Sequence, residues 1–193
     1  MSYKVVLSAL ATALTVIAFV PYARAIVSGA ARPHVFSWII WGTSTFVVFL
    51  ATLDAQGGVG AWPIGVSGVI TLWIAALAYA RRSDVTITKS DWAFFIAALS
   101  SLPLWYATSD PLWAVLVLTS VDLLGFGPTL RKVYRQPHSE PLLFFALLAV
   151  RNLLVIFALE VYSPTTVLFP AAIGWACVCL IAMAVHRRRS QHI

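Results

Sequence analysis

The sequence predicts an all-α membrane protein whose seven transmembrane helices form two parallel three-helix repeats joined by an inverting linker helix (3+1+3). Hydrophobic residues make up 61% of the chain and charged residues only 10%, with a mean hydropathy of +0.89. That composition leaves too little polar surface to cover a water-soluble globule. Two further observations complete the prediction, namely a series of long apolar runs and an internal repeat.

Seven apolar runs approach or reach the length of a membrane span, which needs about 20 helical residues to cross a hydrocarbon core of about 30 Å. They cover residues 5–27, 35–53, 58–80, 92–108, 111–134, 141–159 and 164–185. Because they lack apolar/polar alternation, they predict helices, which satisfy their own backbone hydrogen bonds in lipid. A polar residue followed by proline, typical of a helix start, opens the last three at Asp110-Pro111, Glu140-Pro141 and Ser163-Pro164.

A secretory signal is the alternative interpretation of the first run. Lys4 precedes it, and Ala23-Arg24-Ala25 resembles a small-residue cleavage site. The run is long for a signal sequence, and a similar segment recurs later in the chain, so we predict a first helix. The chain then forms one membrane domain, divided into residues 1–82 as the first repeat, 83–109 as the linker and fourth helix, and 110–193 as the second repeat with a basic tail.

Basic residues predict the orientation, because Lys and Arg near helix ends stay on the cytoplasmic side. If successive connectors alternate sides, one side carries Arg24, Arg32, Arg81, Arg82, Lys89, Arg131, Lys132, Arg135, Arg187, Arg188 and Arg189. The other side carries only Lys4, and Arg151 lies within a span. We therefore predict an outside N-terminus and a cytoplasmic C-terminus, and the inner membrane of a bacterium is the simplest location.

An internal repeat appears when the first and fifth runs are compared at an offset of 107. The identical pairs are Thr12 with Thr119, Phe19 with Phe126, Pro21 with Pro128, and Arg24 with Arg131. Pro63 and Pro170 in the third and seventh runs share the same offset. Since one odd helix separates the two triplets, both enter the membrane with the same orientation.

This pattern resembles the SWEET and PQ-loop superfamily, in which two three-helix bundles are joined by a linker helix. The proline near the end of the first helix of each bundle carries the resemblance, although Tyr22 and Thr129 stand where the family usually has Gln. The resemblance implies alternating access, with Pro21, Pro63, Pro128 and Pro170 as hinges. A proline inside a membrane helix removes a hydrogen bond and bends the helix, which supports the bends independently.

Two ionisable residues lie within predicted spans, where burial costs about 2.5–3.5 kcal/mol even on translocon scales. Asp122 and Arg151 lie near the middle of consecutive helices, at depths that differ by about 5 Å at 1.5 Å per residue. We predict that they pair, either as a structural ion pair or as part of a solute cavity in which Asp122 carries a proton. Asp122-Leu123-Leu124-Gly125 also resembles the Asp-x-x-Gly of proton-coupled lysosomal PQ-loop amino-acid carriers.

The predicted cavity gains further polar and aromatic groups at a similar depth, because solute sites combine apolar walls with a few placed hydrogen-bonding groups. Besides the two charges, the candidates for solute binding are Thr12, Thr15, Trp41, Ser44, Thr119 and Asn152. Thr15 stands opposite Asp122 in the repeat, and by a looser alignment Thr43 stands opposite Arg151, so the predicted site is asymmetric. Singly, each Ser or Thr is also a residue that bonds the carbonyl four positions earlier.

Other chemistry finds no support in the sequence. Cys177 and Cys179 lack a His partner at their depth, and no phosphate loop, nucleophile elbow or carboxylate pair occurs, so we expect no metal, cofactor or enzymatic activity. The net charge of +6 is a topology signal and does not indicate nucleic-acid binding. The expected partners are the lipid bilayer and a small solute, and a homo-oligomer is compatible with the sequence.

The predicted function is a small-solute transporter for a sugar, amino acid or similar polar metabolite, working by alternating access. The alternative is a non-transporting membrane receptor or assembly factor on the same fold, since fold does not determine function. A receptor would bind at one face without flux.

Overall fold

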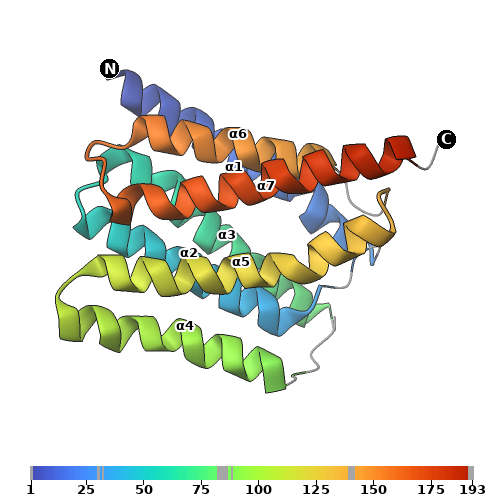
Figure 1. The fold of residues 1–193 in the computed structure, drawn as a ribbon, viewed down its shortest axis with the longest axis horizontal. Coiled ribbons are helices and arrows are strands. Elements are labelled where there is room, and N and C mark those ends of the chain that lie inside the picture. The colour runs from blue at the N-terminus through green and yellow to red at the C-terminus, as the bar shows by residue number, and fades with distance from the viewer. Residues whose placement is uncertain are drawn as a thin grey trace.

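The protein forms a bundle of long α-helices in a computed structural model that describes residues 2–29, 31, 33–81, 87, 89–138 and 142–190. The described residues contain seven α-helices, one short 3₁₀ helix and no strand (Figure 1). In chain order these are α1 (Tyr3–Val27), α2 (Val35–Asp54), η1 (Gly58–Ala61), α3 (Trp62–Ala80), α4 (Lys89–Thr108), α5 (Pro111–Arg135), α6 (Leu142–Ala158) and α7 (Pro164–Ser190).

Five segments are long and apolar enough to cross a membrane: α1, α2, η1 with α3, α5 and α7. The apolar α6 is shorter, with 17 residues, and α4 is not among the five because its first turn is polar. Large apolar side chains such as Ile17, Leu124 and Trp175 are exposed along the outside of the bundle. A water-soluble monomer rarely exposes so much apolar surface. The prediction of an all-helical, membrane-spanning chain is confirmed at this level.

The helix ends follow the predicted capping chemistry where they are described. The Asp110 carboxylate accepts a hydrogen bond from the Leu112 backbone N–H at 2.9 Å, just before α5. Before α7, Ser163 and Thr166 exchange side-chain to backbone hydrogen bonds of 3.0 and 3.3 Å, which satisfies two donors of the first turn. The predicted start at Glu140-Pro141 lies outside the described residues.

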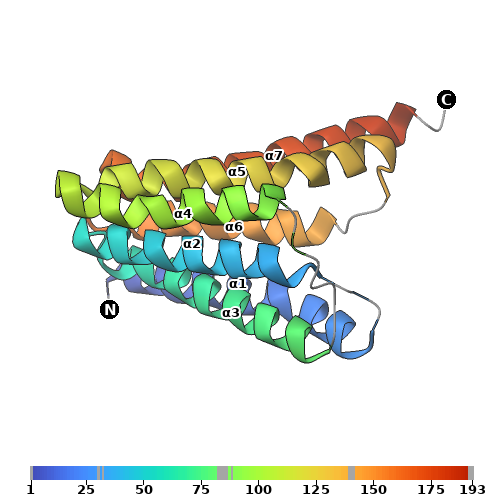
Figure 2. The same cartoon turned by 90° about the horizontal axis from the view of Figure 1, so that it is seen from below.

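For description, α1, α2 and α3 are called the first helix group and α5, α6 and α7 the second. In the first group α3 contacts both α1 and α2, and in the second group α7 contacts both α5 and α6. The groups meet along α1 with α6 and along α2 with α5. Helix α4 lies at the edge of the bundle against α5, with a smaller contact to α2 (Figures 1 and 2).

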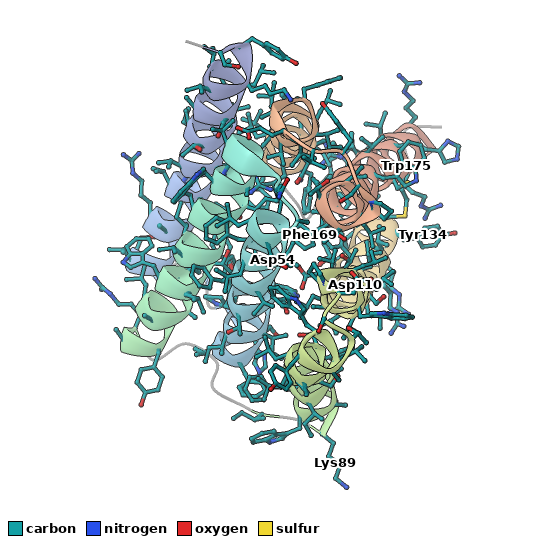
Figure 3. The ribbon with its side chains drawn as sticks, turned by 90° about the vertical axis from the view of Figure 1, so that its left-hand side faces the viewer. Asp54, Lys89, Asp110, Tyr134, Phe169 and Trp175 are labelled. Atoms are coloured by element: carbon teal, nitrogen blue, oxygen red, sulfur yellow. The ribbon has the colours of Figure 1, made fainter. Side chains whose placement is uncertain are left out.

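The two ends of the bundle differ in charge. One end, here named the basic end, carries the C-terminus and the ends of α1, α3 and α5, with Arg24, Arg81, Arg135 and the last turn of α7 (Figure 1). The opposite end carries the start of α1, the end of α2 at Asp54 and the start of α5 after Asp110 (Figure 1), and Figure 3 views the bundle from this end. The described Lys and Arg residues near helix ends thus gather at the basic end, and Lys4 lies at the opposite end.

Three of the four predicted hinge prolines lie inside helices, and one does not. Pro21 and Pro170 are internal to α1 and α7, and Pro128 lies within the range of α5. Pro63 instead occupies the first turn of α3, at the junction with η1. Because a first-turn N–H has no intrahelical acceptor, Pro63 removes no hydrogen bond within α3, and its assignment as a hinge stays a prediction.

Candidate functional site

Arg151 is a buried charged residue that donates three side-chain hydrogen bonds inside the bundle. It projects from α6 with only 3% of its surface exposed. Its Nε donates to Thr15 Oγ1 of α1 at 3.2 Å, one Nη donates to Asn152 Oδ1 at 2.9 Å, and the other Nη donates to the Pro63 carbonyl oxygen of α3 at 2.6 Å. Two of the three acceptors belong to the first helix group. Arg151 therefore joins the two groups across the bundle.

The predicted pairing of Asp122 with Arg151 is wrong. Both side chains are described, and no ion pair joins them. The prediction assumed that consecutive helices pack as antiparallel neighbours, but α7 packs against both α5 and α6. Arg151 consequently faces α1 and α3, and its hydrogen bonds go to neutral oxygens.

Three buried oxygen atoms on α2 and α5 have no hydrogen-bond partner. They are Ser44 Oγ, Thr119 Oγ1 and Asp122 Oδ1, on residues whose exposed fractions are 0%, 3% and 7%. A buried polar atom without a partner costs about 1–3 kcal/mol, so native proteins rarely keep one unless water, an ion or a ligand satisfies it. A water molecule or a polar solute at these atoms would supply the missing hydrogen bonds.

The contact between Trp41 and Gly125 fixes the register of α2 against α5. A Cβ atom added to Gly125 would lie 2.6 Å from Trp41 Nε1, so the indole packs directly against the α5 backbone. The two helices are antiparallel, since α2 begins and α5 ends at the basic end (Figure 1). Ser44 and Asp122 each lie three residues from this contact in the same direction along the bundle. They are therefore at the same depth on facing helices.

The remaining predicted polar residues are satisfied within the protein. Thr12 Oγ1 and Thr15 Oγ1 donate to the carbonyl oxygens of Ser8 and Ala11, four residues earlier in α1. Asn152 Nδ2 donates to the Leu148 carbonyl oxygen in the same way. The alternative in which a polar side chain bonds the carbonyl four positions earlier thus holds for these residues of α1 and α6. Ser44 on α2 and Thr119 on α5 make no such bond.

Toward the opposite end, η1 and the segment before it close tightly against the end of α6. A Cβ atom added to Gly60 would lie 2.7 Å from the Leu159 backbone nitrogen, and the Glu160 backbone N–H donates to the Gly57 carbonyl oxygen at 3.1 Å. Lys4 Nζ donates to the Leu159 carbonyl oxygen at 2.7 Å. Only glycine permits so close a backbone approach. The two helix groups are therefore in direct backbone contact at this end.

Toward the basic end, aromatic rings fill the space between the groups. Phe19 of α1 makes edge-to-face contacts with Trp38 of α2 and Phe144 of α6, with centroid distances of 6.3 and 5.9 Å. Tyr22 stacks on Trp38 at 4.9 Å, and Trp41 meets Trp38 edge-on at 5.9 Å. These rings form an apolar layer on the basic-end side of the central polar residues.

Two features of the site were not predicted from the sequence. The Pro63 carbonyl acts as an acceptor for Arg151, and a backbone acceptor leaves no mark in a sequence. The close contact of η1 with α6 did have a signal, namely the run Gly57-Gly58-Val59-Gly60 at the start of the third apolar run. Clustered glycines at a helix end are typical of a close backbone approach.

Comparisons with known proteins give the site no precedent. No protein family, no curated protein and no solved structure matches the chain. In the part of the chain that the structure describes, no three His, Cys, Asp or Glu side chains are grouped so as to hold a metal ion. The site therefore has to be interpreted from its own geometry.

Proposed function

We propose that the protein is a small-solute transporter that works by alternating access, with its binding site between α2 and α5. The observation that carries this proposal is the set of three buried, unpartnered oxygens on Ser44, Thr119 and Asp122. A bundle that served only as a scaffold would gain stability by replacing such atoms with apolar ones. Retaining them is expected where a polar solute supplies the missing hydrogen bonds.

The packing of the helices supports two repeats with an inverting α4, as the resemblance to the SWEET and PQ-loop superfamily implies. In each group the third helix packs between the first and the second. Under the offset of 107, α1 corresponds to α5 and α2 to α6. The repeat therefore pairs the contact of α1 with α6 with an equivalent contact of α5 with α2. Both contacts are present. A two-fold axis along the membrane normal accounts for this exchange.

The same offset relates the two polar pairs at the group interfaces. Thr15 corresponds to Asp122, and Ser44 corresponds to Arg151, one position from the Thr43 of the looser alignment. The first interface contains the Thr15–Arg151 hydrogen bond, and the second places Asp122 at the depth of Ser44. We infer that the first pair is a joint between the repeats and that the second pair belongs to the solute site. Arg151 donates its hydrogen bonds to protein oxygens, so we do not expect it to bind the solute in this conformation.

The contacts on either side of the central residues support a state that is closed at both ends. The glycine contact between Gly60 and Leu159 lies on one side, and the aromatic layer around Phe19 and Trp38 lies on the other. Opening one of them at a time would expose the central oxygens to one side of the membrane. The internal prolines Pro21 and Pro170 are the positions at which we expect the helices to bend.

We further propose that the opposite end faces outward and the basic end faces the cytoplasm, in a bacterial inner membrane. The described Lys and Arg side chains near helix ends support this orientation, because all but Lys4 lie at the basic end. Cysteines placed at Asp54 and Arg189 test it. A membrane-impermeant maleimide added to intact cells should label the first and not the second, and the reverse labelling would refute the orientation.

Uptake by proteoliposomes tests the transport proposal. The purified chain is reconstituted and supplied with a panel of labelled sugars, amino acids and nucleosides, with and without a pH gradient. We expect uptake of one class, lost in Asp122→Asn. The matched control is Asp110→Asn, which exchanges the same groups at the exposed cap of α5, where an asparagine oxygen still accepts the Leu112 N–H. Absence of uptake of every class by folded protein would favour a receptor instead.

A further inference from the structure

An apolar groove runs along the outer surface between α1 and α3, away from the central polar residues. Its volume is about 500 Å³. Its wall is almost entirely hydrocarbon and includes Val16, Phe19, Val20 and Val27 of α1 with Ile70 and Trp73 of α3. Several of these side chains are strongly exposed, Val16 at 44% and Trp73 at 54%. Apart from Phe19, which also belongs to the aromatic layer, the lining residues take no part in the proposed transport path.

The groove has the length of one membrane leaflet. It extends along α1 from Val16 to Val27, which at 1.5 Å per residue is about 16 Å. A hydrocarbon core of about 30 Å gives each leaflet about 15 Å. The groove therefore begins near the middle of the membrane and ends where the headgroups of one leaflet begin. Its length and its hydrocarbon wall fit a single acyl chain.

The groove ends at a positive charge. Arg24 and Ser28 line it at the basic end, one turn apart on the same face of α1. Arg24 is exposed, and no ion pair to it occurs among the described residues. Ser28 follows the last residue of α1 and is also exposed, and its hydroxyl donates to the Ala25 carbonyl oxygen at 3.1 Å. The Arg24 guanidinium is therefore the group that fits a phosphate with a net negative charge at the headgroup level.

We propose that this groove binds one anionic phospholipid from the leaflet at the basic end, with an acyl chain between α1 and α3 and its phosphate on Arg24. A zwitterionic lipid has the same acyl chains, but its headgroup carries a cation that weakens the attraction to Arg24. The site should therefore select for headgroup charge. The repeat provides a comparison, because Arg131 occupies the same position on α5 and is not part of this groove.

Retention of lipid by the purified chain tests the proposal. The full-length protein is equilibrated in detergent micelles containing equal amounts of phosphatidylglycerol and phosphatidylcholine and then washed, and the retained lipids are measured by mass spectrometry. We expect an excess of phosphatidylglycerol for the unmodified chain. Arg24→Gln should lower that excess about fivefold, the equivalent of about 1 kcal/mol for one basic residue near the membrane surface. Arg131→Gln should leave it unchanged.

A second variant tests the hydrocarbon part of the site without changing any charge. Val20 is 38% exposed in the wall of the groove, and Val20→Phe would fill the groove while keeping the surface apolar. We expect this variant to retain less of both lipids. Equal retention of the two lipids by the unmodified chain, or equal effects of Arg24→Gln and Arg131→Gln, would overturn the proposal. The proposal would also be overturned if the unmodified chain stayed dimeric after lipid removal and the Val20→Phe variant were monomeric, since a second copy would then occupy the groove.

Discussion

The hydrogen bond between Arg151 and Thr15 links the two helix groups, and a double-mutant cycle measures its strength. Arg151→Met removes the guanidinium, and Thr15→Val removes the hydroxyl while nearly keeping the side-chain shape. The Arg151 Nε to Thr15 Oγ1 distance of 3.2 Å lies at the upper end of the ordinary range. Thr15 also donates to the Ala11 carbonyl oxygen, so Thr15→Val leaves one helix carbonyl without this additional donor.

The expected coupling follows from the length of this bond and its surroundings. Hydrogen bonds to charged groups contribute about 1.5–3 kcal/mol in soluble proteins. Cycles between transmembrane helices average about 0.6 kcal/mol and reach about 1.7 kcal/mol. For a long, charge-assisted bond we expect a coupling of about 1 kcal/mol. Arg151→Met alone should lower the free energy of unfolding by about 3 kcal/mol, because the Pro63 carbonyl and Asn152 lose their donor as well.

Reversible unfolding in mixed micelles, followed by the loss of helical circular dichroism, gives the four free energies. The matched control is a second cycle between Arg151→Met and Thr12→Val, because the Thr12 hydroxyl bonds only within α1, to the Ser8 carbonyl oxygen. We expect a coupling near zero there. Equal couplings in the two cycles, or a larger coupling of Arg151 with Asp122 than with Thr15, would show that Arg151 does not join α6 to α1 as described.

Two further predictions concern the stability of the bundle. Gly60→Ala should lower the free energy of unfolding by about 1–3 kcal/mol, because its Cβ would meet the α6 backbone at 2.7 Å. Gly127→Ala, whose Cβ would meet no atom of another helix within 4 Å, should change it by less than about 1 kcal/mol in the same unfolding assay, because the gain in helix propensity is offset by the crowding of a Cβ against the following Pro128. Equal losses in the two variants would contradict the contact at Gly60. Ser44→Ala and Thr119→Val should each raise the stability of the solute-free protein by about 1 kcal/mol, since their hydroxyls have no partner, while lowering solute uptake. A loss of stability in both would mean that these hydroxyls are already satisfied.

The helices themselves could be predicted closely from the sequence. Hydropathy depends on local composition, and the run at residues 35–53 became α2 (Val35–Asp54) with a difference of one residue. The helix starting at Lys89 is the exception, since polar residues form its first turn and hydropathy places the start at Trp92. The start of α3 also differed, because a 3₁₀ turn with two glycines, Gly58 and Gly60, precedes Trp62.

The packing order of the helices could not be predicted from hydropathy, and this explains the error at Arg151. Depth along a helix follows from counting residues, and both Asp122 and Arg151 proved to be buried, at 7% and 3% exposed. Which helix faces which depends on side-chain shape, and here α7 packs against both α5 and α6. The partners of a buried charge then follow from tertiary packing, and two of the three acceptors of Arg151 lie more than 80 positions away.

The two interfaces between the helix groups differ in whether their buried polar groups have hydrogen-bond partners, and the proposed repeat makes these groups equivalent. At one interface the equivalent positions hold Thr15 and Arg151, whose polar groups are hydrogen-bonded within the protein. At the other they hold Asp122 and Ser44, each with a buried oxygen that no protein group satisfies. A polar network that is complete holds a structure in place, whereas an incomplete one is stable only when something else completes it. Divergence of the two proposed repeats would thus account for the proposed joint at α1 and α6 and the proposed solute site at α2 and α5.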